Sequence, residues 1–411
     1  MKAARLLSAT AAAVMLAGCS ASGDGVWNSS GSRDISSAVT SRAEEKIPEL
    51  DRRDVELSLA SDYFFELIED KNVRTAMLLM LKGMREHTGT VDLKGLSVRD
   101  DDIKDLFDLL LCCEPGLAWV DYNYEVTADT LGNVLSVNIR YKLDKAAAAK
   151  ASEELRKAVK EIVSAAEGMD DFERMLYFHD TVISSCEYDR SGSNAWSAYG
   201  CLVEGRAVCE GYSKALIALC DEAGVLCLPV SGTGSRDITE LHMWNKVQMD
   251  GEWYNMDLTW DDPTPGDDAP AEGGAGRYDF LHRDYFGQTD AKASADHAAS
   301  GTKFLKYPEA AADKDNYFIH TGRYIDSADS AEDIIYASAV KSLGEGESIF
   351  QLAFSDSGVY DLFYQNELDG GGIFNVLSRL ANEGWPVSAM SYEFVPNKEQ
   401  QVITLIMKKE L

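Results

Sequence analysis

An Asp-Gly pair at residues 250–251 joins two segments in which aromatic and polar residues alternate, HMWNKVQM and EWYNMDLTW. Asp-Gly between alternating segments is a strong signal for a two-residue hairpin turn, because both residues tolerate the positive φ that this turn requires. We therefore predict an antiparallel strand pair over residues 242–249 and 252–260.

The length of this turn decides where two polar side chains lie. With a two-residue turn, Trp244 pairs with Asp257. Two residues further from the turn, His242 pairs with Thr259. His242 and Asp257 then share one face as diagonal neighbours, with backbones about 7–8 Å apart. A three-residue loop would shift the register by one residue and send them to opposite faces.

A cysteine is expected at the start of a helix. The stretch GRAVCEGY (205–212) leads into apolar residues at helical spacing, with Gly224 just beyond the end as a stop signal. Cys209 therefore lies at or next to the helix N-terminus, where unpaired N–H groups and the helix dipole favour an anion. This setting lowers the pKa of a thiol from about 8.5. The same N–H groups can hold the oxyanion that forms when a thiolate attacks a carbonyl.

The blocks VCEGYSKALIALCDEAGV and ELHMWNKVQMDGEWYNMDLTWDDP resemble the transglutaminase-like superfamily, which shares the papain-like fold. The resemblance covers about residues 170–300. It implies an α+β fold, in which a helix carrying the cysteine packs on an antiparallel sheet carrying a histidine and an aspartate. Carried over by position, Cys209 is the nucleophile, His242 is the base and Asp257 orients the imidazole. The resemblance requires no metal or organic cofactor.

Other polar and aromatic residues of this region have competing interpretations. Trp196, Tyr199 and Trp244 could line the cleft or supply an oxyanion donor, but core packing explains them as well. Asp257 could instead cap a turn at the strand end. The remaining histidines and cysteines are expected to be structural, namely His179, His282, His297, Cys112, Cys113, Cys186, Cys201, Cys220 and Cys227.

The N-terminus reads as an export signal, with Lys2 and Arg5 before an apolar stretch too short to span a bilayer. The sequence LAGC at residues 16–19 resembles the lipobox of bacterial lipoproteins, in which the cysteine thiol receives diacylglycerol. We therefore expect a signal peptide over residues 1–18 and a lipid anchor, palmitate being a typical acyl chain, on Cys19. The mature protein would be held on the outer face of a bacterial membrane. Cleavage as an ordinary secreted protein is the alternative.

The rest of the chain divides by pattern. A flexible tether (19–41) precedes an N-terminal α/β domain (42–145), a transglutaminase-like catalytic domain (146–325) and a small C-terminal α/β domain (331–411). Helices are expected over residues 62–82, 147–166, 170–185 and 373–382. Strands are expected over residues 91–96, 134–141, 348–354, 390–395 and 401–407. An acidic, Pro- and Gly-rich loop is expected over residues 262–276, without calcium-site spacing.

The charge balance restricts the partners of this chain. There are 69 acidic and 39 basic residues, for a net charge of −30, so nucleic acid would be repelled. Expected partners are the membrane, through the anchor, and a protein or peptide substrate at the cell surface, with cell-wall peptide as one option. The expected function is a thiol enzyme that acts on amide bonds through an acyl-enzyme thioester, by hydrolysis or by transfer to an amine. The alternative is a non-catalytic surface-binding module on the same fold.

Overall fold

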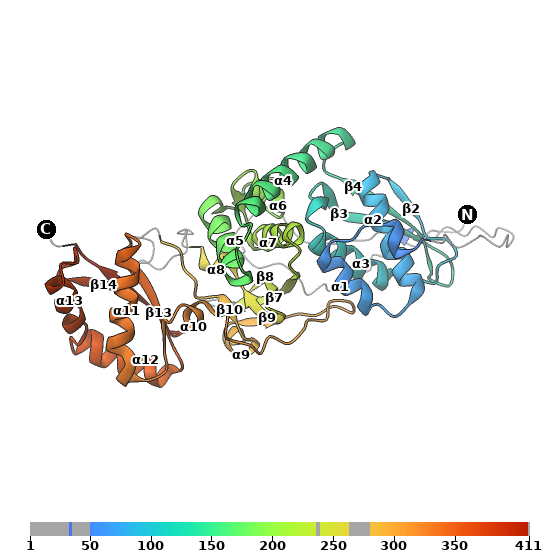
Figure 1. Cartoon of the computed structure of the whole chain (residues 1–411). Coiled ribbons are helices and arrows are strands. Elements are labelled where there is room, and N and C mark those ends of the chain that lie inside the picture. The colour runs from blue at the N-terminus through green and yellow to red at the C-terminus, as the bar shows by residue number, and fades with distance from the viewer. Residues whose placement is uncertain (1–32, 35–49, 236–238, 263–279, 410–411) are drawn as a thin grey trace. The chain divides into compact units, whose positions relative to one another are not determined.

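The computed structural model describes residues 33–34, 50–235, 239–262 and 280–409 (Figure 1). The chain forms two compact units, Met1–Gln248 with His297–Pro308, and Met249–Asp296 with Glu309–Leu411. The expected signal peptide, Cys19 and nearly all of the expected acidic loop lie outside the described residues. None of the helices in the described ranges combines the length and apolar character needed to cross a bilayer.

The N-terminal part of the first unit places helices beside a small sheet. The helices are α1 (Leu59–Leu67), α2 (Lys71–Glu86) and α3 (Asp100–Cys113), and the strands, in sheet order, are β1 (Arg33–Asp34), β3 (Val120–Ala128), β4 (Val134–Tyr141) and β2 (Thr90–Asp92). The single helix predicted over residues 62–82 is wrong. The chain is extended at Ile68, and the Asp70 carboxylate then caps α2 by accepting from two backbone N–H groups. The strand predicted over residues 91–96 is limited to β2, whereas β4 has the predicted bounds.

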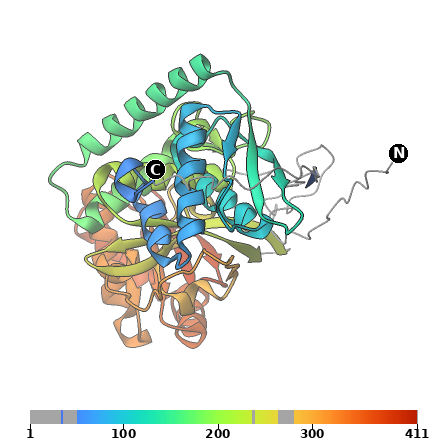
Figure 2. The same ribbon diagram turned by 90° about the vertical axis from the view of Figure 1, so that its right-hand side faces the viewer.

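Four helices follow in the same unit: α4 (Lys145–Ala165), α5 (Asp171–Ser185), α6 (Ala198–Leu202) and α7 (Cys209–Ala223). Helices α4 and α5 confirm the helices predicted over residues 147–166 and 170–185. Asp170 and Glu173 form a capping box at the start of α5. Helix α4 runs along the edge of its unit (Figure 2), and its buried residues are Ala148, Leu155 and Val159.

Helix α7 packs on an antiparallel strand set of the first unit. Strand β7 (Cys227–Ser235) pairs with β8 (Thr239–Met249) on one side and with β11 (His297–Ala299) on the other. The Ser213 hydroxyl of α7 donates to the carbonyl of Trp244 at 3.3 Å, and the Asn245 amide donates to the carbonyl of Ser213 at 3.2 Å. The fold is α+β, with the cysteine-bearing helix on the sheet that carries His242. Two short strands, β5 (Glu187–Tyr188) and β6 (Arg206–Ala207), pair beside α7.

The second unit begins with the hairpin turn. Asp250 and Gly251 have φ values of 49° and 82°, and strand β9 (Glu252–Met256) starts immediately after them. The predicted two-residue turn is therefore confirmed. The strand predicted to run to residue 260 is wrong, because it ends at Met256 and helix α8 (Leu258–Asp261) follows. Strand β10 (Phe286–Gln288) pairs antiparallel with β9, and two short helices, α9 (Asp290–Ala293) and α10 (Tyr317–His320), follow.

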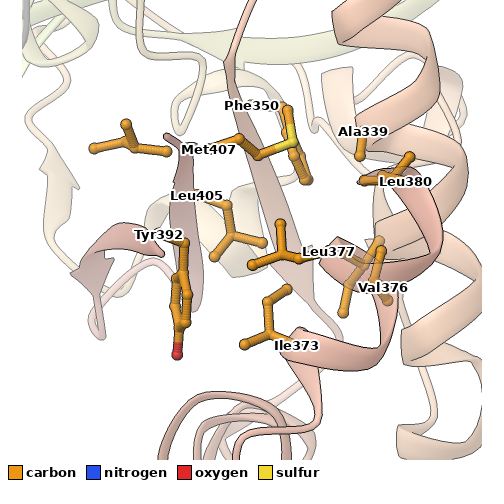
Figure 3. Close-up of a pocket in the computed structure, with 11 residues that line it drawn as sticks. Ala339, Phe350, Ile373, Val376, Leu377, Leu380, Tyr392, Leu405 and Met407 are labelled. Carbon is orange, nitrogen blue, oxygen red and sulfur yellow. The ribbon is translucent and has the colours of Figure 1, made fainter. Parts of the chain in front are cut away.

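The C-terminal part of this unit has its own apolar core (Figure 3). Its sheet order is β12 (Tyr324–Ile325), β13 (Ile349–Phe354), β15 (Val402–Met407) and β14 (Tyr392–Asn397). The helices α11 (Ala331–Gly344), α12 (Ser357–Phe363) and α13 (Ile373–Asn382) cover it. The predicted helix and three strands are confirmed to within about two residues, whereas β12, α11 and α12 were not predicted.

Candidate active site

Cys209 is the first residue of α7, as the sequence predicts. The residue before it, Val208, is extended and gives no side-chain cap to the first turn of the helix. Gly224 ends the helix with a φ of 73°. Cys209 has 8% of its surface exposed, more than any other described cysteine. The structure thus presents this thiol at the positive end of a helix of about four turns, where a thiolate is stabilised.

The other six described cysteines are buried, and no disulfide joins any of the seven in the described ranges. Burial raises the pKa of the Cys112 thiol to about 12 and holds the pKa values of Cys113 and Cys227 well above the ordinary range. These three thiols therefore stay protonated at neutral pH and are poor nucleophiles. This is the structural role that the sequence indicates for them.

His242 lies in the middle of β8 with 2% of its surface exposed. Its ring is 6.1 Å from the Trp244 ring and 5.5 Å from the His297 ring, measured between centroids. The strand register places His242 opposite Gly232 of β7, and Gly232 is in turn opposite Ala299 of β11. The imidazole is thus held on one face of the strand set by neighbouring rings.

Glycines in β7 make room for these rings. His297 lies opposite Gly234, just as His242 lies opposite Gly232. A Cβ atom on Gly232 would lie 2.8 Å from the Trp244 ring and 2.2 Å from the Ala298 carbonyl oxygen. The strand therefore needs glycine at position 232 so that the indole and the neighbouring backbone can approach it closely.

His297 is the residue whose position the sequence analysis missed. It was expected to be structural, yet its ring is 5.5 Å from the ring of His242 and 4.7 Å from that of Trp244. It reaches this face from the three-residue strand β11, after a long separation in sequence. Its position beside His242 depends on the pairing of β11 with β7, which no local pattern in the sequence indicates.

Asp257 belongs to the second unit, where it is buried at the end of β9. Its Oδ1 accepts from the backbone N–H groups of Thr259 at 2.9 Å and Trp260 at 3.2 Å. Asp257 is therefore the N-cap of α8, as the competing interpretation of this residue expects. Asp261 of the same motif accepts from the backbone N–H of Tyr285 at 3.1 Å, which ties the motif to the segment before β10.

The three aromatic candidates have different surroundings. Trp244 packs against both histidine rings. The Tyr199 hydroxyl donates to the Glu154 carboxylate of α4 at 2.8 Å. Trp196 is half-buried, and its carbonyl accepts from the Lys214 ammonium at 3.4 Å. Among the remaining histidines, His179 and His282 contact Asp180 and Gln351, respectively.

A comparison with known protein families agrees with the resemblance seen in the sequence. Residues 156–258, which contain Cys209, His242 and Asp257, match the family model described as the transglutaminase-like superfamily. A candidate cysteine protease from Cytophaga hutchinsonii is 18% identical, with a TM-score of 0.24, over 32% of this chain and 53% of that one. A solved structure described as a TGase is 13% identical, with a TM-score of 0.24, over 45% and 54%. The chain thus spans about half the length of these two structures. No curated protein matches it.

Proposed function

We propose that the protein is a thiol enzyme that acts on amide bonds of proteins or peptides, because residues 156–258 match the family model of the transglutaminase-like superfamily. Cys209 Sγ, as the thiolate, attacks the amide carbonyl. The His242 imidazolium gives its proton to the departing amine, and an acyl-enzyme thioester forms. Water or a second amine then attacks the thioester and gives a proton to the neutral His242 imidazole, and the Cys209 thiolate leaves. No metal or cofactor is part of the proposal.

The observation that carries the proposal is the way α7 meets β8. Ser213, which contacts Trp244 and Asn245, lies one helical turn after Cys209 and on the same face of the helix. His242 lies two residues before Trp244 and on the same face of its strand. The helix start that carries the thiol and the strand that carries the imidazole are therefore held together by direct hydrogen bonds.

In this proposal Asp257 orients the His242 imidazole. The support is the resemblance of the sequence, together with the two-residue turn at Asp250-Gly251, which is the turn length that this role requires. Its capping bonds fix one carboxylate oxygen and so hold the side chain in one rotamer. Asp257→Asn would keep this cap and remove the charge, so activity is expected to fall while α8 remains intact.

Iodoacetamide labelling at neutral pH tests the proposal. We expect Cys209 to be alkylated much faster than the other described cysteines, and Cys209→Ala to abolish amide cleavage and amine incorporation, a loss of at least about 10³-fold. Cys186→Ala, at a second buried cysteine, is the control and should retain activity. Equal labelling of all cysteines, with unchanged activity in Cys209→Ala, would support a non-catalytic binding module instead. Peptides offered with and without a labelled amine separate hydrolysis from transfer.

We further propose that Cys19 carries the lipid anchor that holds the enzyme on the outer face of a bacterial membrane. The support is the LAGC sequence after a short apolar stretch. Growth with a palmitate analogue should label the wild-type protein, and Cys19→Ser should remove the label and release the protein from membranes. If Cys19→Ser kept both the palmitate label and the association with membranes, the proposed anchor would be contradicted.

A further inference from the structure

A buried ion pair follows the proposed nucleophile directly in the sequence. Glu210 has 1% of its surface exposed and Lys214 has 5%. The Lys214 Nζ donates to Glu210 Oε1 at 2.5 Å, one turn apart on α7. Burying two charges costs free energy that surface residues would not incur, so their place beside Cys209 requires an explanation.

The N-terminal part of the chain completes this pair. The Tyr122 hydroxyl of β3 donates to the same Glu210 oxygen at 2.6 Å. The Lys214 ammonium also donates to the Tyr122 oxygen at 3.3 Å and to the Trp196 carbonyl at 3.4 Å. The second oxygen, Glu210 Oε2, is buried without a hydrogen-bond partner. The carboxylate therefore depends on Lys214 for its counter-charge.

Other ionisable groups face the pair from neighbouring elements. Burial raises the pKa values of Asp108 and Cys112 of α3 to about 6 and about 12, and the negative charge of Glu210 acts in the same direction. Lys142, after β4, has its ammonium 4.7 Å from the centre of the Tyr122 ring. The strand set on which α7 packs carries two further ionisable side chains, His242 and His297, whose rings contact each other and Trp244. Among these groups, Lys214 is the cation in direct contact with the carboxylate.

The charge state of Glu210 matters to Cys209 because both lie in the first turn of α7. An uncompensated carboxylate there would oppose a thiolate, by an amount equivalent to about 1.7 pH units at a separation of about 7 Å and an effective dielectric constant of about 20. We propose that Lys214, held by Tyr122, is a positioning residue that neutralises Glu210, so that the start of α7 acts on the Cys209 thiol with the positive end of its dipole alone.

The proposal rests on the proposed function, since Cys209 is the group concerned. Alkylation nevertheless follows the ionisation of the Cys209 thiol without any substrate. The full chain is treated with iodoacetamide from pH 5 to 10, and the rate at Cys209 is followed by mass spectrometry. Lys214→Met should raise the midpoint of the profile by about one to two pH units and slow labelling at pH 7 about ten- to fiftyfold. Glu210→Gln should lower the midpoint. The double variant should return to within a few tenths of a unit of the wild type.

These opposite signs separate an electrostatic role from a merely structural one. Loss of packing would lower the melting temperature of both single variants without moving their midpoints in opposite directions. The matched control is Lys246→Met, a second buried lysine, whose ammonium donates to the Pro308 carbonyl at 2.6 Å, and its midpoint should not move.

If Lys214→Met fails to fold, Glu210→Gln and the charge-neutral double variant still decide the matter. A midpoint that is unchanged in Glu210→Gln overturns this proposal and leaves the thiol enzyme standing. A wild-type Cys209 that reacts no faster than the other cysteines overturns the thiol enzyme and, with it, the role of Lys214.

Discussion

The strand set β11-β7-β8 and the C-terminal sheet of residues 324–407 are both largely antiparallel and both covered by helices, but they are filled differently. The first has glycines in β7 opposite His242 and His297. The second is filled with apolar side chains such as those of Phe350, Leu352 and Ile403. Glycine allows rings and ionisable groups to approach one another, whereas large apolar side chains maximise buried area. We therefore expect the first strand set to serve the proposed chemistry and the second sheet to serve stability.

The largest expected effect lies in the C-terminal sheet. Ile403 is fully buried in β15, so Ile403→Ala should lower the free energy of unfolding by about 2–5 kcal/mol. Urea denaturation measures the loss. Below the transition, alkylation of Cys209 should proceed at the wild-type rate. Leu362→Ala, at a side chain 48% exposed, is the control and should change little. Slower alkylation in the folded Ile403 variant would break the division of roles.

A smaller loss of stability is expected from Gly232→Ala, with a larger effect on the site. The added Cβ would meet the Ala298 carbonyl and the Trp244 ring, so β11 must shift and carry His297 with it. We expect a loss of about 1–3 kcal/mol and at least a tenfold loss of amide-cleaving activity. Gly192→Ala, whose Cβ would meet only Ala195 atoms at ordinary contact distances, should be close to wild type. Wild-type activity in Gly232→Ala would show that close ring packing is not required.

The smallest effect concerns pH. Burial raises the pKa of Asp108 from its ordinary value of 3.8 to about 6. Between these values the folded state holds a proton that the unfolded state has lost, so stability falls as pH rises from about 4 to about 6. Asp108→Asn should remove this fall, so its free energy of unfolding at pH 7 should exceed that of the wild type by about 1–2 kcal/mol. This value is smaller than the full pKa shift implies, because the half-buried carboxyl retains some solvent.

The difference in unfolding free energy between Asp108→Asn and wild type, followed from pH 4 to 7, checks this expectation. Asp129→Asn should show the opposite dependence of the unfolding free energy on pH. Hydrogen bonds from Asn133 lower the pKa of the Asp129 carboxyl, so its contribution to stability is present at neutral pH and is lost as the pH falls. If the difference between Asp108→Asn and wild type did not change from pH 4 to 7, the Asp108 carboxyl of the wild type would be solvated in the folded state.

The features predicted correctly from the sequence are those set by local chemistry. The helix that starts at Cys209 and stops before Gly224 follows from apolar spacing and a left-handed glycine. The Asp250-Gly251 turn follows from its two positive φ values. In both cases a few adjacent residues contain the whole signal, because backbone preference and periodicity act over one or two turns.

The errors arose where a capping aspartate competed with a longer pattern or where distant strands pair. Asp70 divides the helix expected over residues 62–82, and Asp257 ends a strand that alternation extends to residue 260. His297 reaches the site through the pairing of β11 with β7, which is a tertiary contact. The Glu210–Lys214 pair has helical spacing in the sequence, but its burial depends on Tyr122 from β3.

The hydrogen bond from Tyr122 to Glu210 has a practical consequence for dissecting the protein. The segment recognised by family comparison, residues 156–258, begins after β3 and ends before β11. A fragment cut at those limits would lose both the hydroxyl that holds the buried carboxylate and the strand that brings His297 to His242. The segment that matches the family model is thus shorter than the segment that must fold together. Expression fragments should be designed on the longer segment.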